Sequence, residues 1–318
     1  AGAFAAGKKA GLGGAIAVNT LLNETAAFVE DSTITTTGAF SLKAEDRGTV
    51  VTLAVAGAGS QKIAIAGSVA LNLFDNDIDA HVFNSTIQAG GAIALTAQDR
   101  EISVALGGGI AVSTSSGAGG AAIGVNLIFN EVTSYVESST VTSTASTIDV
   151  DAIAEEVLVS VTVGGAGGDK FALGGSVSAS VVMNTVEAGA FSDSTLTANG
   201  NIGITASDKT TDVVVAGGFA ISLSSGAVGV AASAIYIENG ILAVIDDSSV
   251  TSSAGAVTLA AGAGQPDTPA DPSDIALGTS GVTLPTTSSS SVINVTFGGA
   301  GGLFVGDASP ALAEKFRV

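Results

Sequence analysis

The feature that most constrains this chain is an internal repeat of about 54 residues. An asparagine returns five times, at intervals of 53, 54, 54 and 55 residues, and two further markers keep the same phase. Because a repeat of this length means that each unit is completed by its neighbours, it decides the fold class before any local propensity does. The markers are Asn23, Asn76, Asn130, Asn184 and Asn239, the triplets that start at Ser32, Ser85, Ser139, Ser194 and Ser248, and the aliphatic anchors Leu42, Leu95, Val150, Ile204 and Leu259.

Segments within each copy alternate with a period of two residues, which is typical of β-strands. In 102–113 and 63–73, branched aliphatic residues alternate with Ala, Ser and Gly. We expect the aliphatic face to fill the core and the small-residue face to meet another layer or to form a smooth exterior. The sequence therefore predicts an all-β parallel β-solenoid (β-helix) of five copies over 1–262. Each copy would form one wide rung or two rungs of about 27 residues. The alternatives are an array of antiparallel hairpins or a barrel.

The repeated asparagine coincides with a change of strand phase. In the second copy the apolar residues move from odd positions, such as Leu71, to even positions, such as Phe74 and Ile78. Such a slip would turn every later side chain to the other face, so we expect a bulge or corner there. Asparagine tolerates the left-handed backbone of such corners. A structural role for the asparagines is therefore favoured over ligand binding.

The two ends of the chain differ from the repeats. All five prolines follow Gly264, and proline is excluded from central strands, so 263–291 is predicted to be an inserted Pro/Ser/Thr-rich loop. Residues 292–318 are predicted to be a partial sixth copy, because Val295–Gly302 parallels Val161–Gly168, and Ser309-Pro310 would then start a short helical cap. Ala1 enters the repeat partway without a preceding cap. Either the chain is an excised piece, or its open end stacks on another molecule.

Three segments, STITTTGAFSLKAED at 32–46, STIQAGGAIALTAQD at 85–99 and STLTANGNIGITASD at 194–208, resemble rungs of filamentous-haemagglutinin-type adhesins. The longer unit, with Gly-Ser-Val-Ala-Leu-Asn at 67–72, is similar to repeats of leukotoxin-like filamentous adhesins of Gram-negative bacteria. The resemblance covers about 1–262 and 292–306. It implies secretion, display on the cell surface, and attachment or fibre building. It implies no catalytic residue.

Composition limits the possible partners. The net charge is −19 with only ten basic residues, so the clustered Lys and Arg that nucleic acids require are missing. The absence of cysteine excludes disulfides and zinc–thiolate sites. No secretory signal is visible in 1–7, and the uncharged stretches 102–130 and 213–237 alternate with period two, so we expect no membrane span. The remaining partners are neighbouring repeats or further copies stacked end to end, and host or surface glycans or proteins.

Several motifs suggest chemistry but have a simpler structural interpretation. Asp75, Asp77 and Asp79 cluster oxygen ligands suited to Ca²⁺, yet other copies lack them. Gly164–Asp169 matches a calcium-repeat core only once, and Gly117–Ala122 fits a dinucleotide fingerprint that needs a following helix. His81 is the only histidine and is predicted to be an ordinary strand side chain.

Acidic residues also recur at the strand exits at one phase, namely Asp46, Asp99, Glu155 and Asp208. We expect them to form a solvated stripe along one side. The enzymatic alternative, a carbohydrate lyase or hydrolase, needs grouped carboxylates in a cleft, and no single copy concentrates them. The sequence therefore predicts a non-enzymatic extracellular shaft segment of a large bacterial surface adhesin, with a self-assembling filament subunit as the alternative. Apart from a weak Ca²⁺ candidate at the three aspartates, no cofactor is predicted.

Overall fold

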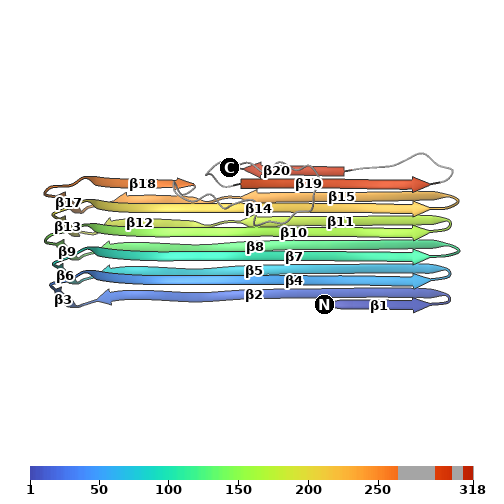
Figure 1. The fold of residues 1–318 in the computed structure, drawn as a ribbon, viewed down its shortest axis with the longest axis horizontal. Helices are drawn as coiled ribbons and strands as arrows, with labels where there is room; N and C mark the ends of the chain where they lie inside the picture. Colours follow the sequence, from blue (N-terminus) through green and yellow to red (C-terminus); the bar gives the residue numbers. More distant parts are fainter. Residues whose placement is uncertain (264–290, 303–310, 318) are drawn as a thin grey trace.

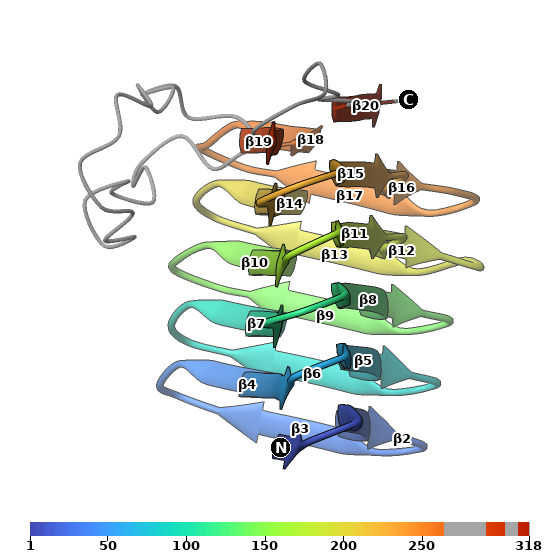
Figure 2. The same cartoon turned by 90° about the vertical axis from the view of Figure 1, so that its right-hand side faces the viewer.

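A computed structural model describes residues 1–263, 291–302 and 311–317, and every strand pairing in it is parallel. Each repeat forms a single wide rung that runs out along one sheet, returns along a second, and crosses a short third (Figures 1 and 2). The fold is therefore a parallel β-solenoid with one rung per repeat. The alternatives that require antiparallel pairing are wrong.

Three sheets supply the walls of the solenoid, and the strands of each follow one another up the stack (Figure 1). The first contains β1 (Gly2–Gly7), β4 (Phe40–Ser60), β7 (Ile93–Ser113), β10 (Ile148–Gly168), β14 (Ile202–Ser222), β18 (Val257–Ala263) and β19 (Ser291–Gly302). The second contains β2 (Ala10–Glu30), β5 (Ile63–Phe83), β8 (Gly117–Glu137), β11 (Phe171–Val182), β12 (Thr185–Phe191), β15 (Gly226–Ile237), β16 (Gly240–Ile245) and β20 (Ala311–Arg317). The short third sheet contains β3 (Thr33–Thr36), β6 (Thr86–Ala89), β9 (Thr140–Ser143), β13 (Thr195–Ala198) and β17 (Ser249–Ser252).

The register confirms the sequence markers. The anchors Leu42, Leu95, Val150, Ile204 and Leu259 are direct neighbours from rung to rung. At the corner, the hydroxyls of Ser85, Ser139, Ser194 and Ser248 each accept a hydrogen bond from the backbone N–H of the serine one rung below, as Ser139 does from Ser85 at 2.9 Å. With strands of 21 residues, a rung is about 70 Å wide, whereas five rungs rise only about 24 Å. The described stack is therefore wider than it is tall.

The interior changes character along the width of each rung. Where all three sheets meet, the space is filled by large aliphatic side chains such as Ile78, Ile93 and Leu95. A smaller cluster around Phe74 and Leu158 lies next along the strands. Beyond it only two sheets face each other, and the buried cluster there consists entirely of alanines. The solenoid is thus thick at one end and thin at the other.

In the thin half the expected assignment of faces is wrong, because the small residues point inward and the branched aliphatics outward. Ala64 and Ala66 are buried, while Ile63 and Ile65 between them are 51% and 50% exposed. The reason is the close approach of the two sheets. A Cβ at Gly164 would lie 1.7 Å from the carbonyl oxygen of Gly175 on the opposite sheet. Ordinary sheets separated by larger side chains pack about 10 Å apart. The two sheets of the thin half lie too close together for such side chains to fit between them.

The predicted change of phase at the repeated asparagine is also wrong. Strand β5 runs without interruption from Ile63 to Phe83, and its even positions point inward throughout, Asn76 included. The left-handed backbone occurs later, at the corner before each serine triplet. Among the described residues, those other than glycine with positive φ are Asp31, Asn84, Ser138, Ser192, Asp193 and Asp247.

At the C-terminal end, the sixth copy pairs in the predicted alignment, since Val295 neighbours Val215, which neighbours Val161. The predicted helical cap is wrong, because Ala311–Arg317 forms strand β20 and pairs with β15. Nearly all of the predicted loop 263–291 lies outside the described residues. Within the described part of the chain, no helix is long and apolar enough to cross a membrane.

Candidate functional site

The most unusual chemistry of the molecule is a row of carboxyl groups inside the solenoid, between the large aliphatic core and the cluster around Phe74. The first sheet contributes these groups at inward positions of successive rungs. The second sheet places the column of repeated asparagines opposite them. The row consists of Asp46, Asp99, Glu101, Glu156 and Asp208.

The asparagines tie the two sheets together by donating to these carboxyl groups. The Asn23 side-chain amide donates to Asp46 at 2.8 Å, and that of Asn130 donates to Asp99 at 2.5 Å. The Asn184 amide donates to both Glu156 and Asp208, at 2.9 Å each. The Oδ1 atoms of Asn76, Asn130, Asn184 and Asn239 also accept the backbone N–H of the asparagine one rung below, as Asn130 does from Asn76 at 3.2 Å. The repeated asparagine therefore has a structural role, but as an internal cross-link and not as a left-handed corner.

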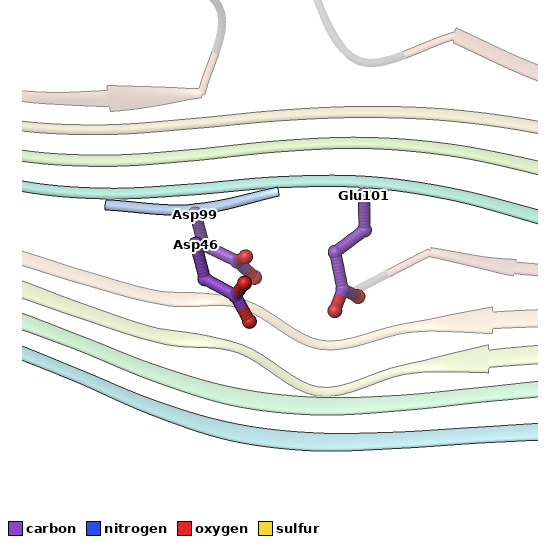
Figure 3. A group of neighbouring side chains, drawn as sticks. All are labelled: Asp46, Asp99 and Glu101. Carbon is purple, nitrogen blue, oxygen red and sulfur yellow. The ribbon is translucent and has the colours of Figure 1, made fainter. Parts of the chain in front are cut away.

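Three of the carboxyl groups form a compact group. One oxygen each from Asp46, Asp99 and Glu101 lie within 4.8 Å of one another, and Figure 3 shows the three side chains extending into the same region. Asp99 is fully buried and Glu101 is 2% exposed, while Asp46 is half-buried. The Oδ1 atom of Asp99 has no hydrogen-bond partner. Among the described residues, this is the one group of three that has the spacing of a metal site.

Burial makes the ionised forms of these groups costly. Burial, and then the negative charge of Asp46, raise the pKa of Asp99 to about 7. Burial, and then the charge of Asp99, raise the pKa of Glu101 to about 9. Burial and the neighbouring carboxylates also hold the pKa of Glu156 well above its usual value. At neutral pH the row therefore requires protons or a bound cation.

The expected solvated stripe of Asp46, Asp99, Glu155 and Asp208 is wrong in two respects. Asp99 and Asp208 are fully buried. Glu155 does not align with Asp99 and Asp208 of the neighbouring rungs, because Ala154 occupies the equivalent position in its own rung. Glu155 instead points to the outer face, where it forms an ion pair with Arg100 at 2.7 Å. Sequence reasoning missed Glu101 and Glu156. These acidic residues point inward two positions after Asp99 and Ala154, respectively.

The predicted calcium ligands Asp75, Asp77 and Asp79 lie on the outer face of β5 and do not converge, since alternate residues of a strand lie roughly 7 Å apart. Asp77 instead stacks between Glu24 and Glu131 of the adjacent rungs. Burial, and then the charges of Asp79 and Glu24, raise the pKa of Asp77. Glu24, Asp77, Asp79 and Glu131 line a shallow hollow of about 260 Å³, so the stacking brings together carboxylates of three successive rungs.

His81 is a stacked strand side chain on this same face. Its ring lies between Phe28 and Tyr135, with centroid distances of 5.5 and 5.0 Å. Its two ring nitrogens contact Asp79 at 2.5 Å and Glu30 at 3.1 Å, so carboxylates occupy both. This arrangement leaves neither nitrogen for a serine nucleophile.

The glycine motifs have structural positions. Gly117–Ala122 opens strand β8 and not a helix, so the geometry of a dinucleotide site is absent there. Gly164–Gly168 ends β10, with Asp169 in the turn that follows. Comparison with known proteins adds no assignment: no family model, no curated protein and no solved structure matches this chain.

Proposed function

We propose that this chain is a non-enzymatic structural and adhesive segment, part of the shaft of a large bacterial surface adhesin. The observation that carries the proposal is the unbroken register of five rungs. In such an array each rung is completed by the next, so a longer chain extends the structure by adding further rungs. The resemblance of the repeat to filamentous adhesins supports the extracellular and bacterial parts of the proposal.

The outer surfaces also support an adhesive role. Both faces of the thin half expose aliphatic and aromatic side chains, among them Ile16 at 71%, Val51 at 61% and Ile221 at 57%. Monomeric soluble proteins rarely expose contiguous apolar patches larger than a few hundred Å². Because one rung is about 70 Å wide and adds only about 4.8 Å of height, the design provides contact area more than length.

A second candidate is a filament subunit that stacks end to end. It is favoured by the constant register of successive rungs, because the ladder that joins β2 to β5 and β5 to β8 within the chain could also join the rungs of two chains.

Electron microscopy of the purified chain separates these candidates. A shaft segment gives single particles about 70 Å wide, whereas a filament subunit gives fibres with a constant axial repeat. Amorphous aggregates or particles with no long axis would contradict both. The enzymatic alternative is tested by incubation with neutral and acidic glycans, for which we expect no turnover.

A further inference from the structure

The compact group of carboxyl groups inside the solenoid lacks a compensating positive charge. The guanidinium groups of Arg47 and Arg100 lie on the outer face, where they form ion pairs with Glu45 and Glu155. The groups that donate to the compact group are neutral: the amides of Asn23, Asn76 and Asn130, and the backbone N–H groups of Arg47 and Arg100. Three carboxylates this close cannot all ionise without a cation, so the site takes up either protons or a metal ion.

We propose that Asp46, Asp99 and Glu101 bind one Ca²⁺ ion within the solenoid. The first reason is chemical, because carboxylate oxygens are the ligands that Ca²⁺ prefers, and each of the three carboxyl groups offers one oxygen to the group. The second reason is the unpartnered oxygen of Asp99. A buried polar atom without a partner is costly, and an ion at this position would satisfy it.

The number of carboxyl groups favours Ca²⁺ over Mg²⁺, because Mg²⁺ keeps several of its waters and usually takes only one or two carboxylates from a protein. The three carboxyl oxygens lie within 4.8 Å of one another, so one ion can lie between them. Asp46 is half-buried, which gives an ion a route from solvent.

The site is distinct from the aspartates of the outer face, and the inference does not depend on the proposed function. It combines residues of two neighbouring rungs, β4 and β7, so Ca²⁺ would act as an additional cross-link between them. Asp99 and Asp46 are direct neighbours in the ladder. We therefore expect bound Ca²⁺ to stabilise the folded stack by mass action.

The test is isothermal titration of the full chain with Ca²⁺ after removal of metals with a chelator. We expect one Ca²⁺ per chain, and we expect Asp99→Asn and Glu101→Gln to weaken binding at least about tenfold, the loss that even an outer-shell partner typically produces. Both substitutions nearly conserve shape, and circular dichroism checks the fold. Glu156→Gln is the matched control, because Glu156 is equally buried in the next rung but lies outside the group of three.

Two results would overturn the proposal. One is the absence of Ca²⁺ binding by the unmodified chain, with no rise in its thermal midpoint in millimolar Ca²⁺, which would mean that the carboxyl groups hold protons. The other is binding that survives both substitutions or disappears in Asp77→Asn, which would place the ion on the outer face. The unmodified chain decides the first point even if a variant does not fold.

Discussion

The close approach of the two sheets in the thin half predicts opposite effects for substitutions at two adjacent glycines. Gly119 and Gly120 follow each other in β8 but point to opposite faces. A Cβ at Gly120 would lie 2.0 Å from the carbonyl oxygen of Gly165 and 2.6 Å from that of Gly109. A Cβ at Gly119 would have its nearest neighbour 4.0 Å away, at the carbonyl oxygen of Leu173. Only the inward methyl group therefore meets the backbone of other strands.

To reach ordinary contact at Gly120, the sheets must move apart by about 1.4 Å. A gap of that size removes a large part of the dispersion energy of the atoms lining it, and overpacking of a core typically costs about 1–3 kcal/mol. We expect Gly120→Ala to destabilise the fold by roughly that amount. We expect Gly119→Ala to stabilise it by about 0.4–1 kcal/mol, because alanine has less backbone freedom to lose on folding.

The assay is urea unfolding of both variants, followed by circular dichroism, with comparison of midpoints at equal slopes. The reasoning would be refuted if the two variants unfolded at the same urea concentration, or if Gly120→Ala were the more stable one. Such a result would mean that the small-residue faces do not pack against each other.

Three further predictions follow from the interior row of carboxyl groups and from the stacked rings of Phe28, His81 and Tyr135 on the outer face. The folded-state pKa values of Asp99 and Glu101 are raised to about 7 and 9. These groups therefore stabilise the fold fully below their unfolded pKa near 4 and lose that contribution as the pH rises through the folded-state values. Without divalent cations, the urea midpoint should fall from pH 5 to pH 9, and Glu101→Gln should make this decrease smaller. Asn130→Ala should cost about 1–3 kcal/mol in urea unfolding, because it removes donors to Asp99 and Glu101; an unchanged midpoint would contradict the cross-link. Tyr135→Ala should cost about 0.5–1.5 kcal/mol of stacking with His81 in addition to lost burial. Phe28→Ala is the comparison, because its ring is stacked on one side only. A loss of stability in Tyr135→Ala no greater than that in Phe28→Ala would argue against a stabilising stack of the three rings.

The register was predictable because it depends on residues that every copy repeats. Leu42 and Leu95 mark the same inward position of neighbouring rungs. The assignment of faces in the thin half was not predictable from hydrophobicity, since Leu71 and Leu73 point outward. The sequence signal for this assignment was the alternation of residues along one continuous strand. Ile78 and Val82 point inward, so the even-numbered Ala70 and Asn72 of the same strand point inward as well.

The candidate site was missed for a related reason. Asp46 lies four residues after Leu42 and Asp99 lies four after Leu95, whereas the residue four after Val150 is Ala154 and not Glu155. Grouping residues by acidity instead of register therefore selected a residue of the outer face. The burial of Asp99 and Glu101 was not suggested by composition, because acidic residues are normally solvated. The helix expected after Pro310 failed because pairing with β15 overrides the local capping signal.

The most direct test of the central claim, rungs stacked in parallel and in register, uses engineered cysteines in a chain that has none of its own. Val51 and Val104 are neighbours on the outer face of β4 and β7, while Leu106 is two positions further along β7. The account predicts that Val51→Cys with Val104→Cys forms an intramolecular disulfide on mild oxidation, because their Cα atoms lie about 4.8 Å apart. Val51→Cys with Leu106→Cys, at about 8 Å, should react far more slowly. Equal rates for the two pairs, or a faster offset pair, would contradict the stacking.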